Sequence, residues 1–262
     1  MPIREHIQKG NKDHNLIMWM KFDGDLMEEV SGLDMAAMFG WPNTQIRNWR
    51  WFNDPAGSGT QCIARSSTKG ANGNLQGFPS IIVDTREYRA DVPTQFKPFR
   101  QCPSSAYSDA AINYLLGYTL EFEWYPNANS AQAYLLESYD GIYGNNTNMY
   151  GAELYRQGTN LIMKFRTGTK TLCSFSNGRW YKISIDFIDN HNNTYSTRFR
   201  VYDNDVLVAD SDNITGMPTI PYGSTNRNNR VMCFFNSHYG YYAIAVNMTD
   251  YLRNVKVYKT AA

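Results

Sequence analysis

The sequence predicts an all-β protein built as an antiparallel β-sandwich of two sheets, of the jelly-roll type. Three observations predict this fold class. Many short segments alternate apolar and polar residues, and clusters of turn residues separate them. Aromatic residues make up 15% of the 262 residues, which favours strands over helices. No segment has the strand–helix–strand spacing of a parallel sheet, so the strands are expected to pair with antiparallel neighbours.

The strand signals begin at residue 16. Residues 1–15 are polar and have no period, which predicts an N-terminal arm, and residues 16–262 are expected to form one domain. The first strand is predicted where alternate residues on one face are all apolar: Leu16, Met18, Met20 and Phe22. The segment Asp23-Gly24-Asp25 then supplies a turn.

Two later segments carry the clearest alternation. In GYTLEFEWYPN (117–127), Pro126 ends a strand with one apolar face, formed by Tyr118, Leu120, Phe122 and Trp124. In GRWYKISIDF (178–187), Trp180 stands at the start of a half-buried strand whose apolar face is Tyr181, Ile183, Ile185 and Phe187. The opposite face of that strand is polar, with Lys182, Ser184 and Asp186.

Further strands are predicted at 80–84, 133–138, 152–157, 161–167, 170–176, 196–203, 206–210, 230–237 and 251–260. Gly168 is expected to connect a hairpin, and Asp203-Asn204-Asp205 to form the turn before residue 206. Between residues 40 and 115, Gly, Pro and Ser predict loops and short strands. A helical turn is expected at 108–116, capped by Ser108 or Asp109.

Composition argues against several function classes. Lys and Arg total 25 against 24 Asp and Glu, so no net field favours nucleic acid as a partner. No apolar run approaches the roughly 20 residues that span a bilayer, so no membrane insertion is expected. The N-terminal residues lack the apolar core of a secretory signal, so no signal peptide is expected. Four widely spaced cysteines are expected to be free thiols that fill space: Cys62, Cys102, Cys173 and Cys233.

Four stretches, in a fixed order, share the pattern of one known superfamily. They are LIMWMKFDGDLMEEVSG (16–32), GYTLEFEWYPN (117–127), GRWYKISIDF (178–187) continuing into FRVYDNDVLVAD (199–210), and YLRNVKVYKT (251–260). The chain thereby resembles the concanavalin A-like lectin/glucanase superfamily, in particular its laminin-G-like and pentraxin-like members. The departures are Asp205, where that family usually has a turn Gly, and residues 40–115. The resemblance implies a lectin-like jelly roll.

Some members of this superfamily are β-glucanases, which need two carboxylates roughly 5–5.5 Å apart for a retaining mechanism. Their hallmark, Glu-x-Asp-x-x-Glu on one strand, is absent from this chain. Glu121 and Glu123 share one strand face, but the third acid is missing, and alternating charge is typical of a solvated sheet face. We therefore expect a protein that is not an enzyme, with a glycoside hydrolase of the same fold as the disfavoured alternative.

The resemblance also implies a calcium ion, because this superfamily often holds one with loop Asp and Asn side chains and backbone carbonyls. The candidate ligands are Asp203 and Asp205, and Asp210 and Asp212 follow close by in the sequence. Hairpin turns also favour Asp and Asn for backbone reasons alone. Both interpretations of these acids stay open, and no other cofactor is expected.

An aromatic segment, WPNTQIRNWRWFND (41–54), is the candidate ligand-binding site. Trp41, Trp49 and Trp51 lie among Pro and Asn residues, and Trp faces on loops can stack on sugar rings. Trp49 and Trp51 are two residues apart, so one buried strand face is the alternative.

These observations favour a non-enzymatic binding or structural module. By fold analogy, a lectin-like jelly roll without catalytic acids and without a signal peptide is typical of a bacteriophage virion protein, such as a capsid decoration or an adhesin. The arm would dock on the particle, with other virion proteins or a second copy as partners, and the sandwich would bind cell-surface or mucosal glycans. A free carbohydrate-binding lectin and a protein-interaction module remain alternatives.

Overall fold

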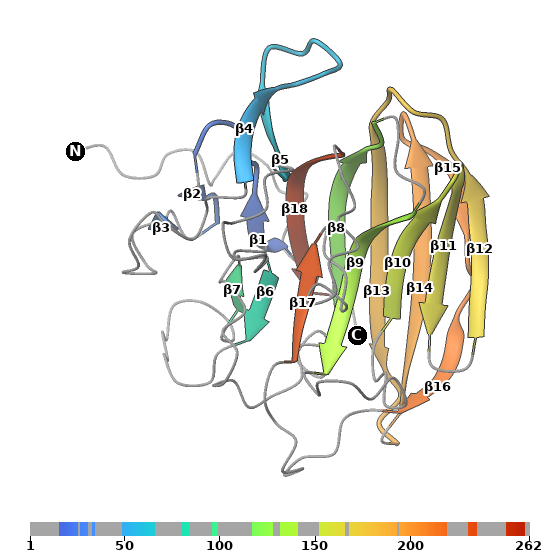
Figure 1. Ribbon diagram of the computed structural model, residues 1–262. Coiled ribbons are helices and arrows are strands. Elements are labelled where there is room, and N and C mark those ends of the chain that lie inside the picture. The colour runs from blue at the N-terminus through green and yellow to red at the C-terminus, as the bar shows by residue number, and fades with distance from the viewer. Residues whose placement is uncertain are drawn as a thin grey trace, which may run out of the picture.

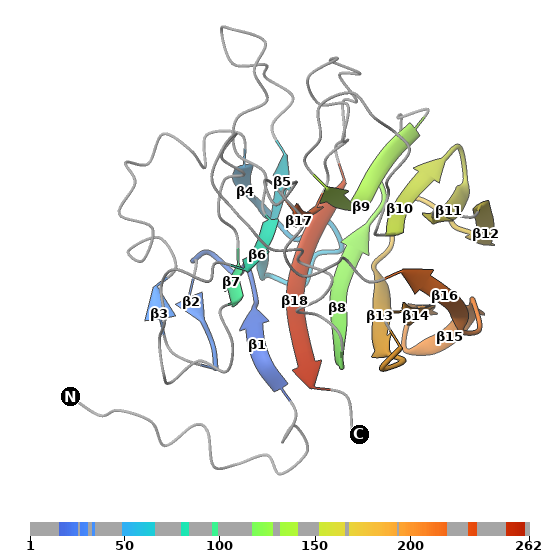
Figure 2. The ribbon, with the colours of Figure 1, turned by 90° about the horizontal axis from the view of Figure 1, so that it is seen from below.

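The computed structural model describes residues 16–25, 27–30, 33–34, 49–65, 80–83, 96–98, 117–127, 132–140, 152–165, 168–192, 194–218, 230–234 and 250–259. Within these residues all regular structure is β-strand, and every strand pair is antiparallel. Figures 1 and 2 show two sheets stacked as the layers of a sandwich. The predicted fold class, an all-β antiparallel sandwich of two sheets, is therefore confirmed.

Sheet A is the larger layer. Its main path runs in the order β15 (Val206–Asp210), β14 (Thr194–Asp203), β13 (Tyr181–Asp189), β8 (Tyr118–Tyr125), β18 (Tyr251–Lys259), β1 (Leu16–Met20), β2 (Met27–Glu28) and β3 (Leu33–Asp34). Off this path, β16 (Ile214–Pro218) pairs with β14, and β5 (Gln61–Arg65) pairs with both β18 and β4 (Trp49–Asn53). The first half of β18 therefore borders the β4–β5 hairpin, and its second half borders β1.

Sheet B forms the second layer. Its order is β12 (Gly168–Ser174), β11 (Asn160–Phe165), β10 (Ala152–Gln157), β9 (Gln132–Asp140), β17 (Arg230–Phe234), β6 (Ser80–Val83) and β7 (Phe96–Pro98). The order shows that strands next to each other in the sequence mostly pair with each other at the β12 end. The strands from β9 to β12 form a meander, and its last hairpin, β11–β12, is the one predicted at Gly168.

The core lies between the two sheets and comes from the alternate residues that the sequence marks as apolar. In β8, Leu120, Phe122 and Trp124 are completely buried, and the ring of Trp124 packs edge-on against Phe175 at 4.8 Å. In β13, the buried face includes Ile183, Ile185 and Phe187. Full burial of one such side chain stabilises the fold by roughly 1.5–3 kcal/mol, so this interface is the main source of stability.

The strong strand predictions are confirmed, but the bounds differ by a few residues. Five strands are not predicted, namely β2, β3, β5, β7 and β16, and β4 is predicted only as the alternative for the aromatic segment. Of these five, β2, β3 and β7 have two or three residues, too few for an alternation to be recognised. β5 has three consecutive buried residues, Cys62, Ile63 and Ala64, and so no alternation. The predicted arm at 1–15 and the predicted helical turn at 108–116 lie outside the described residues.

A bulge in β18 changes which side chains share a face. The pairing with β8 shifts between Arg253 and Lys256, and Asn254 adopts a left-handed backbone with φ of 51°. The Asn254 N–H donates to the backbone carbonyl of Lys21 at 3.1 Å. Without the bulge, alternation would put Arg253 and Lys256 on opposite faces of the sheet; with it, both lie on the outer face.

The described residues contain no helix of the length and apolarity that a bilayer crossing takes.

Candidate functional site on the outer face of sheet A

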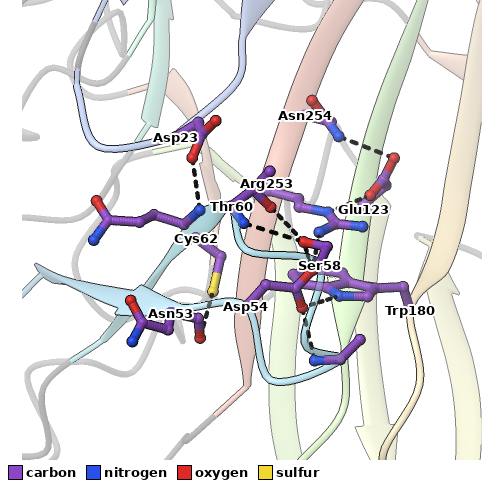
Figure 3. A network of polar contacts seen from close by, with 12 residues as sticks. Asp23, Asn53, Asp54, Ser58, Thr60, Cys62, Glu123, Trp180, Arg253 and Asn254 are labelled. Atoms are coloured by element: carbon purple, nitrogen blue, oxygen red, sulfur yellow. Dashed lines mark hydrogen bonds and ion pairs between the residues drawn. The ribbon is translucent and has the colours of Figure 1, made fainter.

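The β4–β5 hairpin is fixed to sheet A by one buried carboxylate, Asp54. Its Oδ1 accepts the backbone N–H of Ala56 and the indole Nε1–H of Trp180, both at 2.8 Å. Its Oδ2 accepts the hydroxyl of Ser58 and an Nη1–H of Arg253, the latter at 2.6 Å. Figure 3 shows Asp54 at the centre of these donors, which come from the hairpin loop, β18 and the start of β13. A single side chain thus ties three separate parts of the chain together.

The environment keeps Asp54 ionised. Burial alone would raise the pKa of this carboxyl, but the hydrogen bonds from Ser58, Trp180 and Ala56 and the charge of Arg253 lower the pKa to about 2. Because both oxygens are occupied by donors and the side chain is only 1% exposed, this carboxylate has no free lone pair to act as a base or nucleophile. Its role in the site is to position the loop.

Arg253 extends the network across the sheet. Its Nε–H donates to Glu123 at 2.6 Å, and its guanidinium lies 4.0 Å from the ring centroid of Trp180. The second oxygen of Glu123 accepts the amide of Asn254 at 3.1 Å, and the amide oxygen of Asn254 accepts the indole N–H of Trp19 at 3.2 Å. The network therefore reaches from the hairpin loop to β1.

A second anchor holds the other end of the hairpin loop. The backbone N–H of Gln61 donates to Asp23 at 2.6 Å, in the turn after β1. Gly24 in that turn has φ of 87°, and a Cβ there would lie 2.8 Å from the side-chain oxygen of Gln61. Any other residue at position 24 would be strained by the positive φ, and its Cβ would force the end of the Gln61 side chain to move. The turn Asp23-Gly24-Asp25 that the sequence predicts is therefore the support of the hairpin.

Aromatic rings form a row across four strands beside the Asp54 network. Neighbouring rings meet edge to face, with centroid distances of 5.5, 5.7 and 5.4 Å, in the order Phe52, Tyr251, Tyr125, Trp180. On the other side of β4, the ring of Trp51 lies 6.4 Å from that of buried Phe22. Trp51 stays 37% exposed and Phe52 36% exposed, so the hairpin carries two aromatic side chains to the surface.

Of the three candidate tryptophans, Trp51 is the one whose side chain the structure describes. Trp51 is partly buried and partly exposed, so it fits both the buried strand face and the ligand-binding surface that the sequence leaves open. Its ring packs near the core residue Phe22, and more than a third of its side chain is exposed. Trp49 lies in β4 opposite Arg65 in the strand register, and its side chain is outside the described residues. Trp41 also lies outside the described residues.

The candidate calcium ligands have cationic partners in the structure. Asp203 pairs with Arg179 at 2.9 Å, and Asp205 pairs with Lys182 at 2.7 Å. In the same part of the sheet, Asp210 pairs with Arg198. Among the residues that the structure describes, no three His, Cys, Asp or Glu side chains gather as a metal site would require. Calcium at Asp203 and Asp205 stays a prediction from the sequence.

The two glutamates of β8 have different surroundings. Glu123 uses both carboxylate oxygens, on Arg253 and Asn254. Glu121 is half-buried, and among the described residues it has no hydrogen bond and no ion pair. The pair therefore provides one unoccupied carboxylate, whereas glycoside hydrolysis by either mechanism needs two.

A second buried carboxylate lies on the inner side of sheet A. Asp250, just before β18, accepts the indole N–H of Trp124 at 2.8 Å and the backbone N–H of Asn127 at 2.9 Å. It also forms an ion pair at 3.0 Å with Arg156 of β10, so this contact joins sheet A to sheet B. Burial raises the pKa of Asp250 to about 6, although the guanidinium and the two N–H donors act in the opposite direction.

No local pattern in the sequence indicates the roles of Asp54, Arg253, Asn254 or the Asp250–Arg156 pair. The only local signal is the loop DPAGSGT (54–60), whose Gly and Pro indicate a turn after the aromatic strand. Nothing local connects this loop to Arg253, which lies 199 residues further along the chain. Trp180 is placed at the start of its strand as predicted, but its hydrogen bond to the loop is not predictable from its segment.

No protein-family model and no curated protein sequence matches the chain. Among solved structures, the PL-14 alginate lyase of Aplysia kurodai aligns over 92% of this chain and 98% of its own, with 11% identity and a TM-score of 0.47. Domain 4 of the extracellular GH43 arabinanase AbnA of Geobacillus stearothermophilus, in complex with arabinotriose, aligns over 94% and 93%, with 11% identity and a TM-score of 0.45. The CBM40 of the Ruminococcus gnavus IT-sialidase, bound to α2,3-sialyllactose, aligns over 60% and 85%, with 16% identity and a TM-score of 0.40. At these identities and scores the likeness concerns the β-sandwich alone and says nothing of the site.

Proposed function

We propose that the protein is a non-enzymatic glycan-binding β-sandwich whose binding surface is the β4–β5 hairpin. The observation that carries this proposal is the exposure of Trp51 and Phe52 on a hairpin that Asp54 holds in place through four hydrogen bonds. An aromatic ring that is rigidly presented loses little entropy when a sugar ring stacks on it.

The polar network supports a binding role rather than a catalytic one. Asp54 accepts four hydrogen bonds, so it has no free lone pair with which to take a proton from a substrate or attack it, and Glu123 is held in place by Arg253 and Asn254. Saturated groups of this kind fix a surface in one shape, which is the property that recognition needs. This is why we prefer the lectin-like proposal over a glycoside hydrolase of the same fold.

The proposal is tested by measuring the binding of the purified protein to a broad glycan array, with and without calcium. We expect at least one glycan to bind, and we expect Trp51→Ala to weaken that binding by about tenfold or more, because truncated aromatic anchors typically cost that much affinity. A calcium-dependent signal would support the prediction at Asp203 and Asp205. The calcium result leaves the hairpin assignment unchanged.

Matched variants separate binding from folding. Trp51→Phe keeps a ring against Phe22 and should retain part of the affinity, and Val206→Ala removes an exposed apolar group at the far edge of sheet A. Circular dichroism should give the same spectrum for all variants. If Trp51→Ala binds as tightly as the wild type, or if no glycan binds, the hairpin is not a sugar site.

The setting we propose is the surface of a bacteriophage particle, where the domain would serve as a decoration or adhesion protein. This setting is inferred from fold analogy, which by itself does not fix a function. Mass spectrometry of purified particles from the source tests it. Stoichiometric presence would support a virion protein, whereas absence from the particles would leave a free lectin as the better assignment.

A further inference from the structure

The centre of the outer face of sheet A carries a straight row of side chains that the hairpin does not cover. Successive strand partners in the register are Trp19 of β1, Lys256 of β18, Glu121 of β8, Ser184 of β13 and Arg200 of β14. Neighbouring strands lie about 4.8 Å apart, so adjacent side chains of this row are within reach of one ligand. We call Trp19, Lys256 and Glu121 the outer-face triad.

The cations around the triad are already paired with carboxylates. Arg200 binds Asp186 at 2.6 Å, and Lys21 binds Glu29 at 3.0 Å. Lys256 is different, because among the described residues its ammonium group forms no ion pair and no hydrogen bond. Its one recorded contact is with the ring of Trp19, at 4.5 Å from Nζ to the ring centroid.

Glu121 is the matching exception among the acids of this face. It is the register partner of Lys256, yet the two charged groups form no ion pair, and no described residue donates a hydrogen bond to the carboxylate. The triad therefore holds a cation and a carboxylate side by side with no ion pair between them; the charge of Lys182 in β13 also acts on Glu121, but its ammonium group donates to Asp205. A ligand that offers an anionic group to Lys256 and a hydrogen-bond donor to Glu121 would match both groups.

Trp19 completes the triad with a ring that is held in one orientation. Its indole N–H donates to Asn254 at 3.2 Å, and Asn254 is itself bound to Glu123 at 3.1 Å. The side chain is half-buried, and the ammonium of Lys21 lies 4.6 Å from the ring centroid. A fixed, partly exposed ring with two ammonium groups close to it favours a flat ligand that bears negative charge.

We propose that the outer-face triad binds a glycan that carries carboxylates, such as a chain of uronic acids. The sugar ring packs against Trp19, its carboxylate pairs with Lys256, and its hydroxyl groups donate to Glu121. The negative charge of Glu121 repels a carboxylate placed on its side, so the triad also sets the direction of the chain. A neutral glycan matches the ring and Glu121 but leaves Lys256 without a partner.

This site is separate from the hairpin. The guanidinium of Arg253 lies between the two regions, where its Nε–H donates to Glu123 and its Nη1–H donates to Asp54. The proposal at the triad therefore stands whether or not Trp51 binds a sugar. Variants at the two places distinguish the two proposals.

The experiment is a calorimetric titration of the full chain with oligogalacturonate, oligoglucuronate and oligomannuronate, and with the methyl ester of each ligand that binds. The wild type should bind at least one acid form, and its ester should bind at least tenfold more weakly. Lys256→Gln should weaken the binding by about tenfold or more, because a hydrogen bond to a charged group is lost. Glu121→Gln should weaken it less, by about threefold.

Lys259→Gln is the matched control, because it removes the same charge from the same strand but on the opposite face, at an exposed position. It should bind like the wild type, and so should Trp51→Ala. Three results would each overturn the proposal: no binding of any of the three acid oligosaccharides, equal binding of the methyl ester, or equal effects of Lys256→Gln and Lys259→Gln.

Discussion

Two buried aspartates lie on opposite sides of the start of β18, and each is paired with an arginine. Asp54 lies on the outer face of sheet A, where four donors bind it and lower its pKa to about 2. Asp250 lies between the sheets with three donors, and burial raises its pKa to about 6. The same pair of residue types thus gives shifts in opposite directions, because the desolvation cost is larger in the interior and one fewer hydrogen bond offsets it.

The partner arginines differ in the same way. Burial lowers the pKa of Arg156, and Asp250 only partly offsets this effect. For Arg253, burial also acts to lower the pKa, but Glu123 and Asp54 together raise it above its usual value. The outer network is therefore a set of mutually satisfied charges that holds a surface hairpin, whereas the inner pair connects two sheets at an electrostatic cost. A change at the inner pair should affect the whole fold, and a change at the outer network should affect the hairpin most.

The largest expected effect is that of Arg156→Met, which removes one partner of the inner pair. It leaves the Asp250 carboxylate buried without a cation, so we expect the free energy of unfolding to fall by about 3–5 kcal/mol. Urea denaturation followed by circular dichroism measures this change. The double variant Arg156→Met/Asp250→Asn should recover part of the loss, because no buried charge is then unpaired. A double variant less stable than Arg156→Met would contradict this account.

The next effect is the pH dependence that the inner pair imposes. The pKa of Asp250 rises from its usual value of 3.8 to about 6 on folding, so between these pH values the folded state binds more protons than the unfolded state. The stabilisation is complete below about pH 4 and is lost as the pH rises through 6, by at most about 3 kcal/mol. Asp54 has the opposite sign, since its lowered pKa gives stability above about pH 4 that is lost as the pH falls towards 2.

Unfolding free energies at pH 4, 5, 6 and 7 check the inner-pair prediction. As the pH rises across this range, the unfolding free energy of the wild type should fall relative to that of Asp250→Asn. Asp54 is ionised in both states above pH 5, so it does not contribute to the slope there. A difference that stays constant from pH 4 to 7 would mean that Asp250 keeps its usual pKa in the folded protein.

The part of the fold that could be predicted is the part that depends only on the residue pattern within one segment. In β13 and β8 the alternation of apolar and polar residues shows which face is buried. That these two strands are neighbours in sheet A is not predictable from either segment, because β9 to β12 of sheet B lie between them in the sequence. β5 is not predicted, because its three consecutive buried residues have no period of two. The sequence therefore predicts the sandwich, the core side of its main strands and several of its turns.

The site could be predicted only in part, because its contacts join distant segments. Trp51 was a candidate from its own neighbourhood, but Asp54 meets Trp180 across 126 residues and Arg253 across 199. The positions of Arg253 and Lys256 also depend on the bulge at Asn254, whose left-handed backbone no local pattern indicates. By alternation alone these two cations would lie on opposite faces of β18, and neither the network nor the outer-face triad could be inferred.

The smallest expected effects are those of changes in the outer network, which Asp54→Asn tests first. The asparagine keeps the shape but loses the charge that Arg253 and Ser58 face, so we expect a loss of about 2 kcal/mol in the free energy of unfolding. Because Arg253 keeps its hydrogen bond to Glu123, the loss should be local. The variant should therefore accelerate the hydrogen exchange of the Gln61 and Gly57 amides more than that of the β8 amides. Ser58→Ala removes one of the four donors and should cost about 1 kcal/mol or less. If Asp54→Asn accelerated exchange in β8 and in the hairpin equally, the outer network would support the whole sandwich, and the contrast with the inner pair would be lost.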